Sequence, residues 1–206
     1  MQIGEDSMAI DLDVVAYHEA GHAVAAKMLG FVVDRISISP QGDAAGHVIH
    51  DYGCNMNEVI YEDEPLRQWA LERAAIVSLA GEVAQRRYRP DSVDPDHGGG
   101  DRVHVHQILD HLADETDQEL RDAWATLLLL RAERLVEVHW PRVEWLASVL
   151  LSQTTIEGAD EIGHVIADAE LPMEYRCKRL SLSDRLAVSV GKPVEMPKPR
   201  GDMPAE

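Results

Sequence analysis

The sequence has few aromatic residues, few cysteines and no long apolar run. Aromatic residues make up only 5% of its 206 positions and include a single Phe, although the hydrophobic fraction is an ordinary 45%. Small aliphatic side chains must therefore fill the core, which favours closely packed helices. A chain of this length can form one domain with a sizeable core, or one domain with an extension.

The two cysteines, Cys54 and Cys177, are far apart and form neither a disulfide framework nor a cysteine-type zinc motif. No apolar run approaches the roughly 20 residues that span a bilayer. The N-terminal stretch MQIGEDSMAIDLD lacks the basic start and apolar centre of a signal peptide. These absences predict a cytoplasmic protein.

Basic residues are also scarce, because 19 Lys and Arg stand against 37 Asp and Glu, for a net charge of −18. A surface this acidic repels phosphate backbones and anionic lipids. We therefore expect neither nucleic acid nor a membrane among the partners.

The apolar periodicity predicts an α+β fold that is mostly α, with a small β-sheet or hairpin. A Thr-capped short helix is expected within TTIEGADEIGHVIADA, and the pattern decays from about Pro172. We expect an N-terminal extension at 1–12, one domain at 13–170 and a tail at 171–206 whose end is disordered. The other expected helices are residues 14–29, 66–88, 101–112, 117–139 and 141–151, and the expected strands lie around Ile36–Ile38 and at His47–His50.

The first expected helix carries the motif His18-Glu19-x-x-His22 inside an apolar run. Residues four apart lie on one face of a helix, so the two imidazoles can hold one metal ion. Glu19 points about 100° away from His18. It is therefore better placed to take a proton from a water molecule at the metal than to be a ligand. Zinc is the expected metal, because it binds imidazole and carboxylate well and has no redox chemistry.

Four segments of the chain resemble the zinc peptidase domain of the FtsH family of membrane-anchored AAA+ proteases. They are AYHEAGHAVAAKMLG, DRISISPQGDAAGHVI, IVSLAGEVAQRRY and GGGDRVHV. In that family the corresponding parts are a HEAGH helix, a hairpin with a Pro-x-Gly turn, a LAGRxAE-like helix and a helix that begins at a zinc-binding Asp. The resemblance covers roughly residues 13–168. It departs from the family at Gln85, where an acidic residue is usual, and the chain has no G-x-x-x-x-G-K-[ST] loop of an ATPase.

The resemblance implies that Asp101 is the third protein ligand that a hydrolytic zinc site requires. The Gly98–Gly100 run before it lets the backbone approach the first helix closely. A plain helix N-cap is the alternative role for Asp101. His104, on the same helix face, is the competing ligand. His97 would need the loop to fold back, and His106 lies about 140° around the helix from Asp101.

We therefore expect a zinc-dependent endopeptidase that hydrolyses peptide bonds in peptides or unfolded proteins without its own ATPase. His18, His22 and Asp101 would hold Zn²⁺, and Glu19 would act as the catalytic base. A separate ATPase or a homo-oligomer are open as further partners. The alternatives are a metal-binding interaction or regulatory module that retains the site without general proteolysis, and a peptidase that cuts one specific protein.

The resemblance also implies that an edge strand near the zinc site receives extended substrate by strand addition. The strand with Ile36 and Ile38 is interpreted first as an ordinary strand of the sheet. The resemblance adds the edge role as an alternative.

Overall fold

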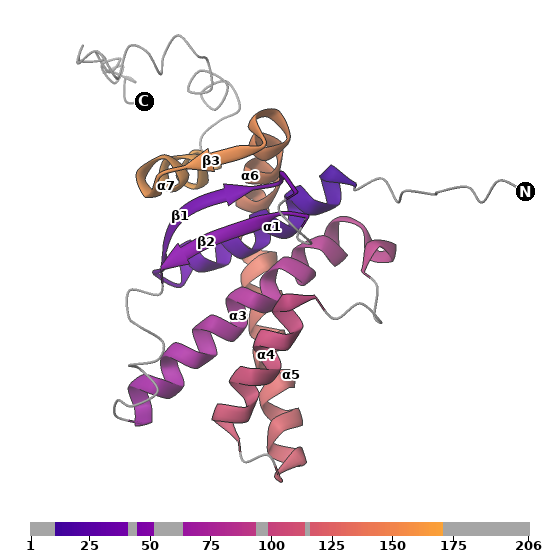
Figure 1. Ribbon diagram of the computed structural model, residues 1–206, viewed down its shortest axis with the longest axis vertical. Coiled ribbons are helices and arrows are strands. Elements are labelled where there is room, and N and C mark those ends of the chain that lie inside the picture. The colour runs from indigo at the N-terminus through magenta and orange to yellow at the C-terminus, as the bar shows by residue number, and fades with distance from the viewer. Residues whose placement is uncertain (1–10, 41–44, 52–63, 94–98, 114–115, 171–206) are drawn as a thin grey trace, which may run out of the picture. The chain divides into compact units, whose positions relative to one another are not determined.

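Six α-helices and a three-stranded antiparallel sheet make up the fold over the residues that the computed structural model describes (Figure 1). This architecture confirms the expected α+β class, mostly α. The expected extension at 1–12 and tail at 171–206 fall almost wholly outside the described part, so these boundaries stay predictions. The described residues are 11–40, 45–51, 64–93, 99–113 and 116–170.

Helix α1 (Leu12–Met28) contains the histidine motif and lies close to the expected range 14–29. It begins after Asp11, whose side chain accepts a hydrogen bond from the Val14 N–H. It ends before Gly30, which has φ +84° and so adopts a conformation that suits glycine. The sequence thus encodes both ends of the helix locally.

Helix α3 (Glu64–Tyr88) packs along α1 at very short range. A Cβ atom added at Gly21 of α1 would lie 2.5 Å from the Ala80 carbonyl oxygen and 2.6 Å from the Ala84 Cβ. Small side chains therefore let the two helices approach where a larger residue would separate them. The buried alanines of α3 are Ala70, Ala74, Ala75, Ala80 and Ala84.

Strand β1 (Val32–Ser37) occupies the centre of the sheet, between β2 (His47–Asp51) and β3 (Thr155–Glu157). Ile36 of β1 is opposite Val48 on one side and Ile156 on the other. The Ile36 strand is therefore an ordinary strand inside the sheet, and the alternative edge role is wrong, because both of its edges are paired. Strands β2 and β3 are the two edge strands of this sheet in the described residues, one on each side of β1.

Strand β3 was not expected from the sequence. Thr154 ends helix α6 (Trp140–Gln153) in a left-handed conformation, and Thr155 then begins β3. The expected Thr cap of the last helix is therefore wrong. Helix α7 (Ala159–Asp168) instead follows Gly158, which makes no side-chain capping bond.

The remaining helices agree with the expected ones to within a few residues. A short 3₁₀ turn, η1 (Pro90–Ser92), follows α3, and α4 (Gly100–Leu112) and α5 (Gln118–Val138) come next. Both α4 and α5 pack on α3, whereas α6 packs on α1 and α7 packs on β1. In the described ranges, no helix is both long enough and apolar enough to cross a membrane.

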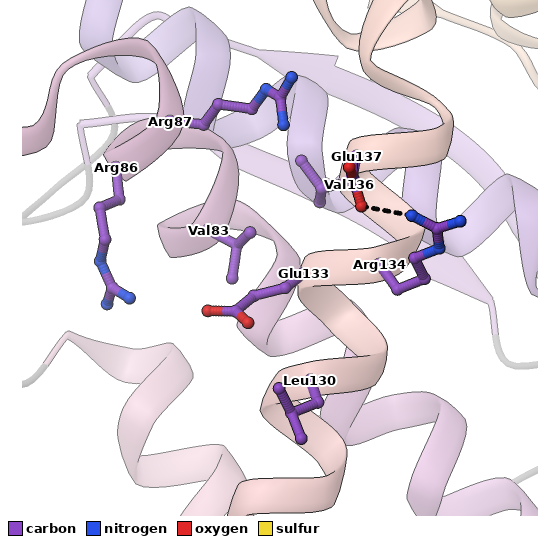
Figure 2. Close-up of a pocket in the computed structure, with 8 residues that line it drawn as sticks. All are labelled: Val83, Arg86, Arg87, Leu130, Glu133, Arg134, Val136 and Glu137. Atoms are coloured by element: carbon purple, nitrogen blue, oxygen red, sulfur yellow. Dashed lines mark hydrogen bonds and ion pairs between the residues drawn. The ribbon is translucent and has the colours of Figure 1, made fainter.

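An open pocket of about 470 Å³ also lies between helices α3 and α5 (Figure 2). None of the expected site residues lines it. Val83 and Arg87 are each two positions from Gln85 along α3, which places their side chains about 200° around the helix from that of Gln85. The pocket is therefore on the opposite side of α3 from Gln85. The lining residues are Val83, Arg86, Arg87, Leu130, Glu133, Arg134, Val136 and Glu137.

Candidate metal centre

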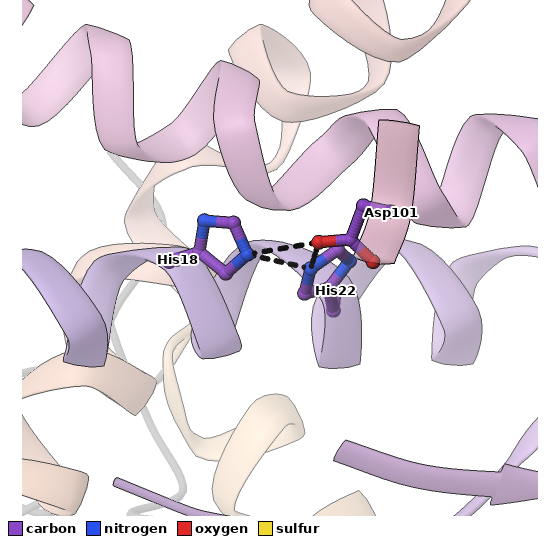
Figure 3. Close-up of side chains that lie close together, drawn as sticks. All are labelled: His18, His22 and Asp101. Atoms are coloured by element: carbon purple, nitrogen blue, oxygen red, sulfur yellow. Dashed lines mark hydrogen bonds and ion pairs between the residues drawn. The ribbon is translucent and has the colours of Figure 1, made fainter. Parts of the chain in front are cut away.

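Three of the residues singled out in the sequence converge where α1 meets the first turn of α4 (Figure 3). The Nε2 atoms of His18 and His22 lie 2.9 Å apart. Asp101 Oδ2 lies 3.2 Å from the first of these nitrogens and 3.1 Å from the second. Gly99 is the N-cap of α4, and Asp101 sits inside the first turn. The carboxylate therefore faces the imidazoles and does not cap the helix.

The other ring nitrogen of each histidine is held by a hydrogen-bond acceptor. His22 Nδ1 donates to the Val77 carbonyl oxygen at 2.8 Å, and His18 Nδ1 donates to Gln85 Oε1 at 2.9 Å. The Gln85 amide is itself oriented, because its Nε2 donates to the Ser92 carbonyl oxygen at 2.9 Å. In the neutral imidazoles both Nε2 atoms consequently carry lone pairs.

The three converging atoms match the requirements of one metal ion. Two imidazole lone pairs and a carboxylate oxygen repel one another at this range unless positive charge lies among them. Ligand atoms about 2.0 Å from a tetrahedral zinc ion lie about 3.3 Å from one another, close to the separations found here. Two nitrogens and one oxygen also form a donor set that zinc binds well. The residues therefore fit a zinc ion.

The electrostatics of the same group favour a cation. Burial alone disfavours a charged His22, but the Asp101 carboxylate, Glu19 and the Val77 carbonyl outweigh it and raise the pKa of His22 to about 9. Burial would likewise raise the pKa of Asp101, yet His22 and His18 lower it far below its ordinary value. The surroundings thus stabilise positive charge beside an ionised carboxylate, whether a proton or a metal ion carries that charge.

Glu19 is close enough to His22, His18 and Asp101 for their charges to act on its carboxyl group, but it is not among the three converging residues. It is only 6% exposed. A Cβ atom at Gly46, just before β2, would lie 2.6 Å from Glu19 Oε1. Burial raises the pKa of Glu19, although His22 and His18 offset part of that effect. A buried carboxylate with a raised pKa is a stronger base than an ordinary one, which suits proton abstraction.

The histidines that compete with Asp101 have other surroundings. His104 Nδ1 lies 2.9 Å from the Ser78 hydroxyl, and this ring is not among the converging donors. His106 is exposed and its Nδ1 donates to the Arg102 carbonyl oxygen on its own helix. His97 lies outside the described residues. The structure therefore brings Asp101, and not His104, within reach of both motif histidines.

Sequence reasoning missed two groups that shape the centre. The carbonyl of Val77 holds His22, but a backbone group leaves no mark on residue identity. Gly81 lies against the His22 ring, because a Cβ atom there would fall 2.2 Å from His22 Nε2. A glycine inside a helix costs about 1 kcal/mol of stability relative to Ala. Gly81, in the middle of a predicted helix, could therefore have indicated that another group packs closely against it.

No family model matches the chain. The chain is similar to a protein of Mycoplasma mobile named ATP-dependent zinc metalloprotease FtsH, with 25% identity over 198 residues. The match covers 79% of this chain and 27% of that protein, so the chain spans about a quarter of the length of the curated relative it matches. The similarity supports a relation to FtsH. The His-His-Asp group, which could hold a metal ion, agrees with that relation.

Proposed function

We propose that the protein is a zinc-dependent endopeptidase that acts on peptides or unfolded polypeptides. The observation that carries the proposal is the convergence of His18, His22 and Asp101 beside the buried carboxylate of Glu19. A donor set with a separate base next to it is what hydrolysis requires. A site that only bound a metal would have no use for a buried base.

His18, His22 and Asp101 would hold the zinc ion. A zinc ion bound there would supply Lewis acidity to a peptide carbonyl and to a water molecule. The Glu19 carboxylate accepts a proton from the water molecule while the water oxygen forms a bond to the carbonyl carbon. Glu19 then passes this proton to the leaving nitrogen as the carbon–nitrogen bond breaks.

The sheet offers a place for an extended substrate. Over the described residues β2 pairs only with β1, so its second edge presents backbone groups to a peptide strand. Gly46, directly before β2, lies against Glu19. A peptide paired along β2 would therefore pass the base. Strand pairing requires an extended chain, which is why peptides and unfolded proteins are the proposed substrates.

Metal analysis combined with a casein assay tests this function. We expect one zinc per chain, cleavage of unfolded casein, loss of cleavage with a chelator and its return with zinc. His22→Ala should lose both zinc and cleavage, whereas His111→Ala, which changes an exposed histidine of α4, should keep both. A zinc-loaded wild-type protein that leaves casein intact would overturn the proposal. It would favour a metal-binding module, or a specific peptidase if one native protein were cut instead.

A further inference from the structure

His104 lies next to the metal centre but is not part of its donor set. It follows Asp101 by three residues on α4, so the two side chains are neighbours on one helix face. Its partner Ser78 precedes Gly81 by three residues on α3, and Gly81 touches the His22 ring. Two independent helices therefore place the His104 ring beside the centre, one turn along from the ligand candidates.

The tautomer of His104 follows from its bond to Ser78. The Ser78 side chain is only 6% exposed. Its hydroxyl makes one hydrogen bond within the part of the chain that the structure describes, to His104 Nδ1 at 2.9 Å. A buried hydroxyl proton is rarely left without an acceptor, and His104 Nδ1 is the partner that Ser78 has among the described residues, so we assign Ser78 as the donor. The ring proton of the neutral imidazole is then on Nε2.

The Nε2–H group of His104 is available to a ligand. It makes no hydrogen bond to any described residue, and His104 is only half-buried, so part of the residue is open to solvent. Burial lowers the pKa of His104, and the Asp101 charge offsets only part of this, so the ring is neutral near pH 7. His104 is thus a preorganised neutral donor.

The same ring lies toward the strand proposed to hold substrate. His50 is on β2, and its pKa responds to His22, His104 and Asp101, so these three side chains lie near it. Strand β2, the centre and His104 therefore border one region of the molecule. A peptide along β2 whose carbonyl reaches the centre would come next to His104.

We propose that His104 is a catalytic residue that donates a hydrogen bond from Nε2 to the substrate carbonyl oxygen as negative charge develops on it. This inference rests on the proposed peptidase function and supplies its oxyanion-stabilising group. Ser78 is the positioning residue, because its hydroxyl sets the tautomer. When water adds to the carbonyl carbon, the carbonyl π electrons move to the oxygen, and a fixed donor there stabilises the transition state more than the bound substrate.

Kinetics of zinc-loaded variants test the role. His104→Ala should keep one zinc and lower kcat about 100-fold with little change in KM, as expected for loss of one oxyanion donor. His104→Gln, whose amide nitrogen can occupy the Nε2 position, should recover part of the rate, whereas the shorter His104→Asn should not. Ser78→Ala should lower kcat less than His104→Ala. The matched control is His106→Ala, an exposed histidine of the same helix, which should behave as wild type.

Binding measured without turnover separates this inference from the proposed function. In a zinc-loaded Glu19→Gln background, His104→Ala should weaken binding of a phosphonamidate peptide, which mimics the tetrahedral oxyanion, while binding of the parent peptide stays unchanged. Equal losses for both peptides, or a wild-type kcat in His104→Ala, would overturn the role of His104 and leave the peptidase proposal intact. A wild-type protein that neither cleaves casein nor binds the phosphonamidate would overturn both.

Discussion

At the scale of single residues, two carbonyl oxygens determine what the motif histidines can do. The Val77 carbonyl fixes the proton of His22 on Nδ1, and the Gln85 amide oxygen does the same for His18. Outer hydrogen bonds of this kind orient metal-binding imidazoles and raise their basicity. Both acceptors are neutral, whereas a carboxylate in either place would carry a negative charge. They fix orientation while adding less negative charge to the site.

Substitutions at Gln85 should therefore change zinc affinity. Gln85→Leu removes the acceptor that His18 requires, and we expect about 10-fold to 100-fold weaker zinc binding. Gln85→Glu keeps an acceptor for His18 and adds negative charge, so this variant should bind zinc more tightly than wild type. Competition with a chromophoric chelator measures both constants. Equal zinc affinity in wild type and Gln85→Leu would show that the amide does not support the centre.

At the scale of secondary-structure elements, the close crossing of α1 and α3 positions the site. Gly21 lies directly against the backbone of α3 at Ala80, and the carbonyl of Val77, on the same helix, holds His22. The small side chains that compensate for the lack of aromatics therefore also bring α3 within hydrogen-bond reach of the histidines. The packing and the chemistry depend on the same short interhelical distance.

Gly21→Ala tests the importance of that distance. The new Cβ would meet the Ala80 carbonyl at 2.5 Å, and a backbone atom cannot move aside as a flexible side chain can. We expect a loss of about 1–3 kcal/mol in the free energy of unfolding, typical of overpacking, together with weaker zinc binding. Denaturant titration measures the first effect.

Gly163→Ala is the matched control, because its Cβ would meet only the flexible end of Lys27, at 3.1 Å. A helical Gly→Ala change without a clash is stabilising by roughly 0.5–1 kcal/mol. If Gly21→Ala were as stable as Gly163→Ala, the close crossing would not be a constraint on the fold.

Periodicity and capping residues predicted the long helices well, since their ends are marked by Gly, Pro or an acidic cap. They failed for β3, because Thr155–Glu157 is too short to show an alternating pattern and forms only by pairing with β1. The edge role considered for the Ile36 strand was wrong for a related reason. The order of strands in a sheet depends on contacts between distant segments, which a local pattern does not show. The spacing of His18 and His22 predicted their shared face. Asp101 needed the family resemblance as well, because 79 positions separate it from His22.

At the scale of the whole molecule, a metal ion would join two parts of the fold. His18 and His22 belong to α1, whereas Asp101 belongs to α4, which packs on α3 and α5. An ion bound only by the folded chain stabilises it by RT ln(1 + [L]/Kd), or about 2.7 kcal/mol at a free concentration of 100 Kd. The stability of the protein should therefore depend on zinc.

Thermal unfolding with and without a chelator measures this dependence. We expect the wild type to melt at a lower temperature when zinc is removed. His18→Ala should melt near the temperature of the chelated wild type and should not respond to zinc. Superimposable wild-type curves in the two conditions would contradict a zinc ion held between α1 and α4.

The most direct test of the proposed zinc peptidase is casein turnover by Glu19→Gln beside wild type, with each protein shown by metal analysis to carry one zinc. The amide keeps the shape of the side chain but cannot accept a proton near neutral pH. We expect a folded, zinc-loaded variant without measurable hydrolysis, next to an active wild type. Turnover by zinc-loaded Glu19→Gln at the wild-type rate would contradict this expectation, because the buried carboxylate would then have no part in the reaction.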